Sequence, residues 1–528
     1  MRRVTRLAVL SAALTILLSA FASPALAASN RERGTRLTKS VVGPLAAQSR
    51  TAALGAPVVH RSTASGRHSD LLANFDGVGS LDSQVTNFGL TFEPPDQGLC
   101  AGNGFVVEMV NSAFRIYDTH GNSLKGPINV NDPFHEDFAA FTSDPRCQYD
   151  KATNTWFAII LFINDPGTAS TLDIAYNTSG DPRTDWSVFR IDTTHSDAPA
   201  SFQCPCFGDQ PTLGIDAYNI YSTTNEFPID INATAFNGAQ IYAISKRDLV
   251  RHRTHPHFVH YGNLSIGGSI AASVQPALTN GPASAEYFLS SLDPTGAGDN
   301  RIGVWALTNV NRVSSGGTPT LSSVVIGSET YAVPPGAAQK GSPQTLDSGD
   351  DRMQQTQFIN GEIWGELTTQ VTSEDNSTPL AGAAWFRVRP HLSGSHLSSA
   401  TMTGQGYVSP EGRSVIYPAI QADGQGHAAM VFTLTGPHMF PGAAYATLSE
   451  DGSEFGDPVL AAAGSGPYVA SPRRWGDYSW AVLDSSSDSV WMATEYMPPK
   501  SSQSSNGRRP WGTRVLHLSL GDNQNGEG

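Results

Sequence analysis

Acidic residues recur at the start of several short, similar stretches of this chain. Basic residues lie within a few positions of them. If the fold gathers these groups, their charges would shift one another's pKa values, which is a common property of functional sites. Two carboxyl groups facing one cleft can cleave a glycosidic bond, one as proton donor and one as base or nucleophile. The acidic residues are Asp96, Asp144, Asp209, Asp350, Asp351 and Asp477, and the arginines are Arg146, Arg352, Arg473 and Arg474.

We therefore predict a carbohydrate site with two kinds of contact. Arginine side chains would hold an acidic sugar through paired hydrogen bonds, and aromatic rings would stack on a sugar ring. The expected catalytic residues are Asp144, Asp209, Asp351 and Asp477, and the expected substrate-binding residues are Arg146, Arg352, Arg474, Trp475 and Tyr478. The alternative is structural, because an aspartate at the start of a strand often accepts backbone N–H bonds and fixes a turn.

The sequence gives no clear metal site, and we assign neither a metal ligand nor a cofactor. Residues 293–300 (DPTGAGDN) and 347–351 (DSGDD) are rich in the oxygen ligands that calcium prefers. Neither has the spacing of an EF-hand loop, and turns of this composition are common on protein surfaces. Calcium binding therefore stays open.

The elements that would position these residues repeat along the chain. Each copy has a polar or proline-containing start, a short strand of small and apolar residues, a turn and a longer apolar strand. The third and seventh copies align Asp209 with Asp477, Asp216 with Asp484 and Glu226 with Glu495. The seven copies cover residues 94–111, 143–162, 208–227, 273–292, 349–369, 416–435 and 475–496.

Seven such copies predict an all-β fold, a single β-propeller with seven four-stranded antiparallel blades. The first strand of each copy would border the central channel, where small residues such as Gly214, Ala419 and Ala481 fit. We expect residues 70–77 to close the ring by pairing with residues 513–520. A pair of β-sandwich domains is the alternative, but no linker interrupts the repeats at residues 200–350.

The composition limits where the protein works and what it binds. The 528-residue chain carries a net charge of −14 and no cluster of Lys and Arg in its body, so we expect no nucleic-acid partner. Residues 1–27 have the basic start, apolar core and small-residue end of a signal peptide. We predict a secreted, extracellular protein without a membrane span, consisting of a flexible lead at 28–69, the propeller at 70–521 and a flexible tail at 522–528.

Four cysteines agree with an oxidising compartment, and disulfides are the favoured fate of all four. Cys100 and Cys147 would lie on neighbouring inner strands, so we slightly favour their pairing. Cys204 and Cys206 would then form a local pair or remain separate thiols.

Several of these stretches resemble a set of exported bacterial β-propeller proteins related in fold to sialidases. The stretches are PPDQGLCAGNGFVVEMVNSAFRIYDTHGN, SDPRCQYDKATNTWF, GDQPTLGIDAYNIYSTTNEF and RWGDYSWAVLDSSSDSVWMATEY. The resemblance covers most of residues 70–500 and implies the propeller architecture. It implies no particular reaction, because one fold supports many functions.

Two functions remain open at this point. The first is a secreted sialidase-like propeller that acts on extracellular glycans, as a glycoside hydrolase or polysaccharide lyase. The second is a non-catalytic propeller that binds a glycan, a protein or a cell-wall component. The sequence leaves the substrate, the existence of catalysis and the oligomeric state undecided.

Overall fold

The computed structural model describes most of the chain beyond residue 63. The described residues are 36–40, 57–59, 64–196, 198–230, 232–233, 235–293, 296–373, 376–470, 474–484, 486–505 and 510–521. The predicted signal peptide at 1–27 and tail at 522–528 lie outside these residues, as does Arg473. Among the described residues, none of the helices has the length and apolar character needed to cross a bilayer.

Each of the seven repeated stretches forms an antiparallel hairpin, as predicted. The small and β-branched residues of each copy build the strands, and Asp, Asn, Gly and Ser build the turns. The hairpins are β4 (Gly98–Gly102) with β5 (Phe105–Val110), β8 (Phe141–Asp150) with β9 (Thr155–Ile163), β13 (Gly214–Ile215) with β14 (Asn219–Pro228), β19 (Gln275–Asn280) with β20 (Ala285–Ser290), β25 (Thr356–Ile359) with β26 (Glu362–Ser373), β29 (Ser414–Ala422) with β30 (Ala428–Gly436), and β33 (Trp480–Asp484) with β34 (Ser489–Tyr496).

Two further antiparallel strands extend each hairpin outward, so each unit has four principal strands. In chain order these outer strands are β6 (Ala113–Asp118) and β7 (Ser123–Ile128), β10 (Ser170–Asn177) and β11 (Ser187–Asp192), β15 (Ala239–Ser245) and β16 (Phe258–Gly262), β21 (Asp299–Thr308) and β22 (Thr320–Tyr331), β27 (Asn376–Ser393) and β28 (His396–Val408), β31 (Met439–Thr447) and β32 (Val459–Ala462), and finally β35 (Gly512–Ser519) and β3 (Asp70–Gly79).

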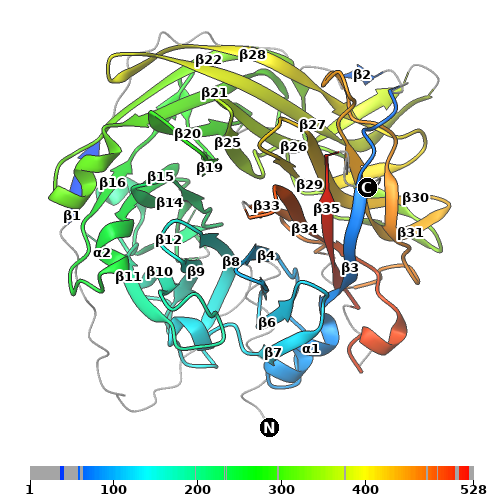
Figure 1. Ribbon diagram of the computed structural model, residues 1–528, viewed down its shortest axis with the longest axis horizontal. Coiled ribbons are helices and arrows are strands. Elements are labelled where there is room, and N and C mark those ends of the chain that lie inside the picture. The colour runs from blue at the N-terminus through cyan, green and yellow to red at the C-terminus, as the bar shows by residue number, and fades with distance from the viewer. Residues whose placement is uncertain are drawn as a thin grey trace, which may run out of the picture.

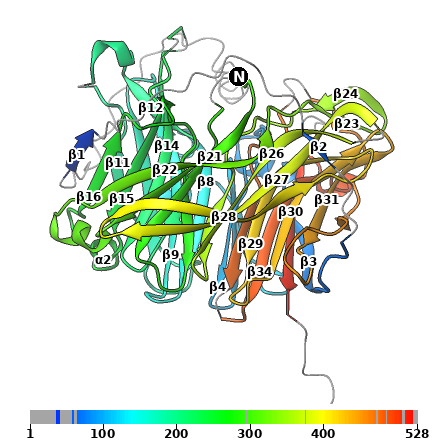
Figure 2. The same ribbon diagram turned by 90° about the horizontal axis from the view of Figure 1, so that it is seen from above.

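The units lie around a common centre, and the long strands β22 and β28 run across the view at one edge (Figure 1). Four of them are separate four-stranded sheets. The third, fourth and fifth are joined by parallel pairing of their first strands, Ile215 with Leu278 and Ala277–Asn280 with Thr356–Ile359. Together with three short strands, they form one 15-stranded sheet. In the side view, inner strands such as β4, β29 and β34 run through the thickness of the molecule, whereas β28 runs across it (Figure 2).

The two ends of the chain meet in one unit, as predicted. β3 pairs antiparallel with β35, from Asp70 opposite Ser519 to Gly79 opposite Gly512. Pairing the two ends covers sheet edges that would otherwise be open to other chains.

Parts of the predicted flexible lead also contact the sheets. β1 (Arg36–Ser40) pairs in parallel with β16, and β2 (Val58–Val59) pairs in parallel with β26. Arg67 Nε donates to the carbonyl oxygen of Leu520 at 2.8 Å. The contacts between the lead and the sheets therefore begin before residue 70.

A small residue lies where the first strands meet, as predicted, and tryptophans on the second strands pack in the interior. A Cβ on Gly214 would lie 2.6 Å from Cβ of Pro276 in the next unit, so the first strands approach too closely for a larger side chain. Trp156, Trp364 and Trp491 on the second strands are fully buried. Trp491 stacks on His517 of β35 with ring centroids 3.9 Å apart.

Both cysteine pairs form disulfides. Cys100 on β4 and Cys147 on β8 are bonded with Cα atoms 5.5 Å apart, which confirms the favoured pairing of neighbouring inner strands. Cys204 is bonded to Cys206, with Cα atoms 4.4 Å apart. This second disulfide closes only a local loop.

Candidate functional site

A group of charged side chains gathers where the chain enters the hairpins. We call it the entrance cluster, and it has a buried part and a part that reaches solvent. Its members interact electrostatically with one another across different units. The cluster consists of Asp96, Asp144, Asp209, Asp347, Asp350, Asp477, Arg146, Arg352 and Arg474. Six carboxyl groups thus face three guanidinium groups, and the cluster has an excess of acidic groups.

The solvent-reaching part is built from ion pairs. Arg474 Nη2 lies 2.6 Å from Asp477 Oδ1, and its Nε lies 3.5 Å from Asp347 Oδ2. Arg352 pairs with Asp350 through two 2.6 Å contacts. About a third of the Arg474, Arg352 and Asp477 side chains is exposed, so a ligand could reach them.

The buried part links neighbouring units by hydrogen bonds. The backbone N–H of Asp477 donates to Asp96 Oδ1 at 2.7 Å, which connects the last unit to the first. Asn111 Nδ2 donates to Asp96 Oδ2 at 2.8 Å, and Asn111 Oδ1 accepts from the backbone N–H of Asp144, also at 2.8 Å. The backbone N–H of Gln210 then donates to Asp144 Oδ2 at 3.1 Å. Through these bonds the carboxylates hold the starts of four successive segments together.

The pattern of acidic residues did not single out several groups that complete this network. Asn111 bridges Asp96 and Asp144, and Gln210 also accepts a hydrogen bond from Arg352 Nη1. Glu93 Oε1 accepts from the backbone N–H of Arg474 at 2.9 Å and from the hydroxyl of Tyr468. Their only signal in the sequence is position, because Glu93 and Asn111 lie at the two ends of the stretch that contains Asp96. The structure buries both.

Burial raises the pKa of four aspartates in the cluster, Asp96, Asp144, Asp209 and Asp347. The pKa of Asp209 rises to about 7, first through burial and then through the charge of Asp144. The pKa of Asp96 rises well above its usual value because of burial and the neighbouring charges of Asp477 and Asp144. That of Asp144 is also raised, by burial and then by Asp477. The opposite charge of Asp477, among others, raises the pKa of Arg474, so Arg474 stays protonated.

Arg146, Tyr478 and Trp475 lie inside the protein. Arg146 is fully buried, and its guanidinium carbon lies 2.9 Å from the ring centre of Tyr478 and 4.7 Å from that of Trp480. This arrangement replaces hydration of the cation by contact with aromatic faces. Trp475 packs in the core and donates from Nε1 to Thr433 Oγ1 at 3.1 Å. The two rings expected to stack on a sugar are therefore covered by protein.

Asp351 points to a different neighbour from the other predicted catalytic residues. Its carboxyl group is buried and interacts with Asp293, and burial followed by the Asp293 charge raises its pKa to about 8. The adjacent Asp350 is the residue that pairs with Arg352. The structure thus brings Asp144, Asp209 and Asp477 into one cluster and leaves Asp351 beside it.

Asp477 lies outside the first strand of its hairpin. β33 begins at Trp480, and Asp477 precedes it by three residues. The two adjacent side chains nevertheless have opposite surroundings, since Asp477 reaches solvent and Tyr478 is buried.

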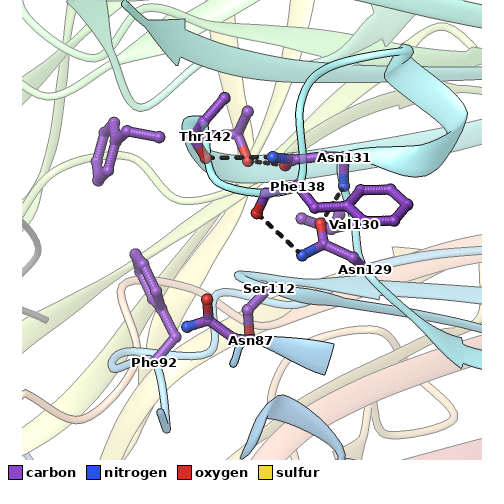
Figure 3. A pocket seen from close by; sticks show the side chains of 10 residues that line it. Asn87, Phe92, Ser112, Asn129, Val130, Asn131, Phe138 and Thr142 are labelled. Atoms are coloured by element: carbon purple, nitrogen blue, oxygen red, sulfur yellow. Dashed lines mark hydrogen bonds between the residues drawn. The ribbon is translucent and has the colours of Figure 1, made fainter. Parts of the chain in front are cut away.

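A small pocket lies beside the cluster, between the first and second units. The pocket leaves about 20 Å³ in which the centre of a water molecule can lie, so it has room for roughly one water molecule. Thr142 Oγ1 donates to Asn131 Oδ1 at its wall, and Asn129 Nδ2 donates to the carbonyl oxygen of Phe138 (Figure 3). The lining contains no ionisable side chain, so it offers no acid–base chemistry.

The two oxygen-rich loops use their aspartates to hold turns. Asp293 accepts from the backbone N–H groups of Ala297 and Gly298, and Asp347 accepts from that of Gly349. These contacts are the local bonds expected of turn aspartates.

Comparison with known proteins finds similarity in structure alone. No protein-family model matches the chain, and no curated protein matches it in sequence. A GH43_1 enzyme from Xanthomonas citri, complexed with xylose, has a TM-score of 0.32 at 12% identity and covers 72% of this chain and 87% of its own. A GH43 endo-arabinanase from Bacillus licheniformis has a TM-score of 0.26 at 14% identity and covers 55% and 93%. An α-L-arabinofuranosidase from Podospora anserina has a TM-score of 0.27 at 7% identity and covers 87% and 98%. TM-scores this low carry no inference about this chain.

Proposed function

We propose that this chain forms a single closed propeller of seven blades, secreted from the cell, whose entrance cluster binds and cleaves extracellular glycans. The observation that carries the proposal is that one cluster contains two carboxyl groups with different surroundings. Asp209 has a pKa of about 7, whereas Asp477 is ion-paired with Arg474. Carboxyl groups in such different surroundings can take the roles of acid and base.

In the proposed reaction, Asp209 supplies the proton to the departing sugar oxygen. Asp477 accepts a proton from the attacking water molecule, as in glycosidases that use two carboxyl groups. Arg352 and Arg474 are each about one-third exposed and would hold acidic groups of the sugar. Asp96 and Asp144 are buried and would keep the cluster in place rather than contact the substrate.

A non-catalytic binding propeller is the second candidate. The observation that favours it is the structural use of Asp96 and Asp144, whose oxygens accept backbone N–H bonds from other units. Under this alternative the exposed arginines would bind an acidic glycan without cleaving it.

A screen against soluble polysaccharides and oligosaccharides separates the two candidates. Binding and the release of reducing ends are measured in parallel for the wild type, Asp209→Asn and Asp477→Asn. We expect cleavage that both substitutions lower by about a hundredfold or more, the usual range for acid–base groups. Binding without cleavage would favour the second candidate. Neither binding nor cleavage of any glycan would contradict both.

A further inference from the structure

A second cluster of potential ligands surrounds the local disulfide of the third unit. Among the described residues, Cys204 Sγ, Cys206 Sγ and a carboxylate oxygen of Glu226 lie within 4.8 Å of one another. Cys206 and Glu226 are buried, whereas Cys204 is partly exposed. In the disulfide form the sulfur atoms are bonded to each other and are not thiolate ligands.

The protein holds these three residues in place from several directions. Cys206 opens β12 (Cys206–Asp209), which pairs with the end of β14, where Gly208 faces Glu226. The backbone N–H of Cys206 donates to the carbonyl oxygen of Thr194 at 2.8 Å. Asn237 Nδ2 donates to the carbonyl oxygen of Phe202 at 3.0 Å and contacts Cys206 Sγ at 3.4 Å. Opening the disulfide would therefore leave both thiols close to Glu226.

His195 holds the carboxylate of Glu226 in this cluster. Its side chain is more than nine-tenths buried, and its Nδ1 is hydrogen-bonded to Glu226 Oε2. Its Nε2 is buried without a hydrogen-bond partner. Carboxylates that bind metals are usually held by a further hydrogen bond, and His195 supplies one to Glu226.

We propose that Cys204, Cys206 and Glu226 form a redox-gated site for a thiophilic divalent cation such as Zn²⁺ or Cd²⁺, with His195 positioning the carboxylate. Thiolates and carboxylates are established zinc ligands, and two thiolates favour soft cations over calcium or magnesium. The site opens when a dithiol donates two electrons to the Cys204–Cys206 bond. That bond breaks, two thiols form, and the dithiol becomes a cyclic disulfide. The cation then displaces one proton from each thiol.

The test uses the full chain and Cd²⁺ alone as the probe. A dithiol is added under native conditions, and alkylation with mass spectrometry identifies which cysteines have been opened. Cys204 is partly exposed, whereas Cys100 and Cys147 are fully buried, so we expect Cys204 and Cys206 to be opened first. Cd²⁺ is then titrated while the ultraviolet thiolate-to-cadmium absorption band is recorded, and Zn²⁺ competition gives its affinity.

We expect one equivalent of Cd²⁺ to bind the reduced protein and none to bind the oxidised protein. Cys204→Ser should abolish the band, and Glu226→Gln should weaken binding by at least about tenfold. Glu286→Gln is the matched control, since Glu286 is a buried glutamate of another unit, and it should bind as the wild type does.

Three results would overturn the proposal. The first is that the dithiol does not open the disulfide in the folded protein. The second is that the reduced protein lacks the thiolate-to-cadmium absorption band. The third is that Glu226→Gln and Glu286→Gln bind Cd²⁺ equally well. The readout is metal binding, so the result does not depend on whether the entrance cluster cleaves glycans.

Discussion

Aspartates occur at both ends of the repeated hairpins, and the two sets have different partners. At the far end, Asp484 accepts from the backbone N–H of Ser486, and Asp216 accepts from those of Tyr218 and Asn219. At the entrance, Asp96 accepts from Asp477, 381 residues away, and Asp144 accepts from Gln210, 66 residues away. Asp484 and Asp216 therefore fix their own turns, whereas Asp96 and Asp144 join separate units.

Exposed aspartates in turns outside these hairpins differ from the buried entrance aspartates in how the protein affects their pKa values. Hydrogen bonds from Asn122 lower the pKa of Asp118 in an exposed outer turn, and bonds from Ser449 and Ser453 lower that of Asp451 to about 2. Burial instead raises the pKa values of Asp96, Asp144 and Asp209. Asp216, a buried aspartate of a far-end turn, also has a raised pKa. At the entrance, pairing with Arg352 outweighs burial and lowers the pKa of Asp350, so burial and ion pairing together set the direction. The entrance thus concentrates aspartates that ionise less readily.

The largest expected effect is the loss of Asp96. Asp96→Ala would remove the acceptor for the backbone N–H of Asp477 and for Asn111 Nδ2, both in a buried setting. We expect the free energy of unfolding to fall by about 2 to 4 kcal/mol, measured by chemical denaturation. Asp484→Ala, which loses one local turn bond, should cost about 1 kcal/mol or less. Equal losses in the two variants would remove the distinction between the two ends.

The pH dependence of stability should carry the signature of Asp209. An aspartate ionises near pH 4 in the unfolded chain, whereas its pKa here is about 7. The folded state therefore holds this proton more tightly, and the associated stability is complete below about pH 4 and is lost as the pH rises to about 7. We expect the melting temperature of Asp209→Asn to fall less between pH 5 and pH 8 than that of the wild type. If the melting temperatures of the two proteins change equally between pH 5 and pH 8, Asp209 ionises in the folded state as it does in the unfolded chain.

A smaller effect is expected when the solvent-reaching ion pairs are broken. Arg474→Met removes the side-chain contacts to Asp477 and Asp347 but keeps the backbone N–H that donates to Glu93. We expect a loss of about 1 kcal/mol, because partly exposed ion pairs contribute little in water. The loss should shrink when unfolding is repeated at high salt. A loss as large as that of Asp96→Ala would mean that the ion pairs, and not the buried hydrogen bonds, hold the units together.

The smallest effect should come from Asp484→Asn. The amide oxygen can still accept from the backbone N–H of Ser486, so the turn keeps its bond. We expect a change in unfolding free energy within about 0.5 kcal/mol by chemical denaturation. A larger loss would show that the charge of Asp484 contributes to the free energy of unfolding. The far-end and entrance aspartates would then differ less in their contribution to stability.

The repeated hairpins were predictable because their pattern is local. Each copy contains a strand of small residues, a turn and a longer apolar strand within about twenty residues. Each copy forms the corresponding antiparallel hairpin. The pairing of β3 with β35 and the bond between Cys100 and Cys147 followed from placing these copies around a ring.

The detailed surroundings of single side chains were not predictable in the same way. Adjacent aspartates such as Asp350 and Asp351 have the same local sequence signal, yet one meets Arg352 and the other meets Asp293. Trp475 and Tyr478 follow a charged start, and only the packing of neighbouring units shows that they are buried. Asp351 meets Asp293 and Tyr478 meets Arg146, residues from separate parts of the chain, so no short stretch contains the signal of these contacts.

The most direct test of the proposed function compares glycan cleavage by Asp477→Asn and Asp484→Asn on a substrate found in the screen. The two aspartates lie in the same unit, one at the entrance and one at the far turn, and both substitutions remove one charge. We predict that Asp477→Asn stays folded and loses cleavage by about a hundredfold or more, while Asp484→Asn cleaves as the wild type does. Equal cleavage by the two folded variants would contradict a catalytic role for the entrance cluster through Asp477.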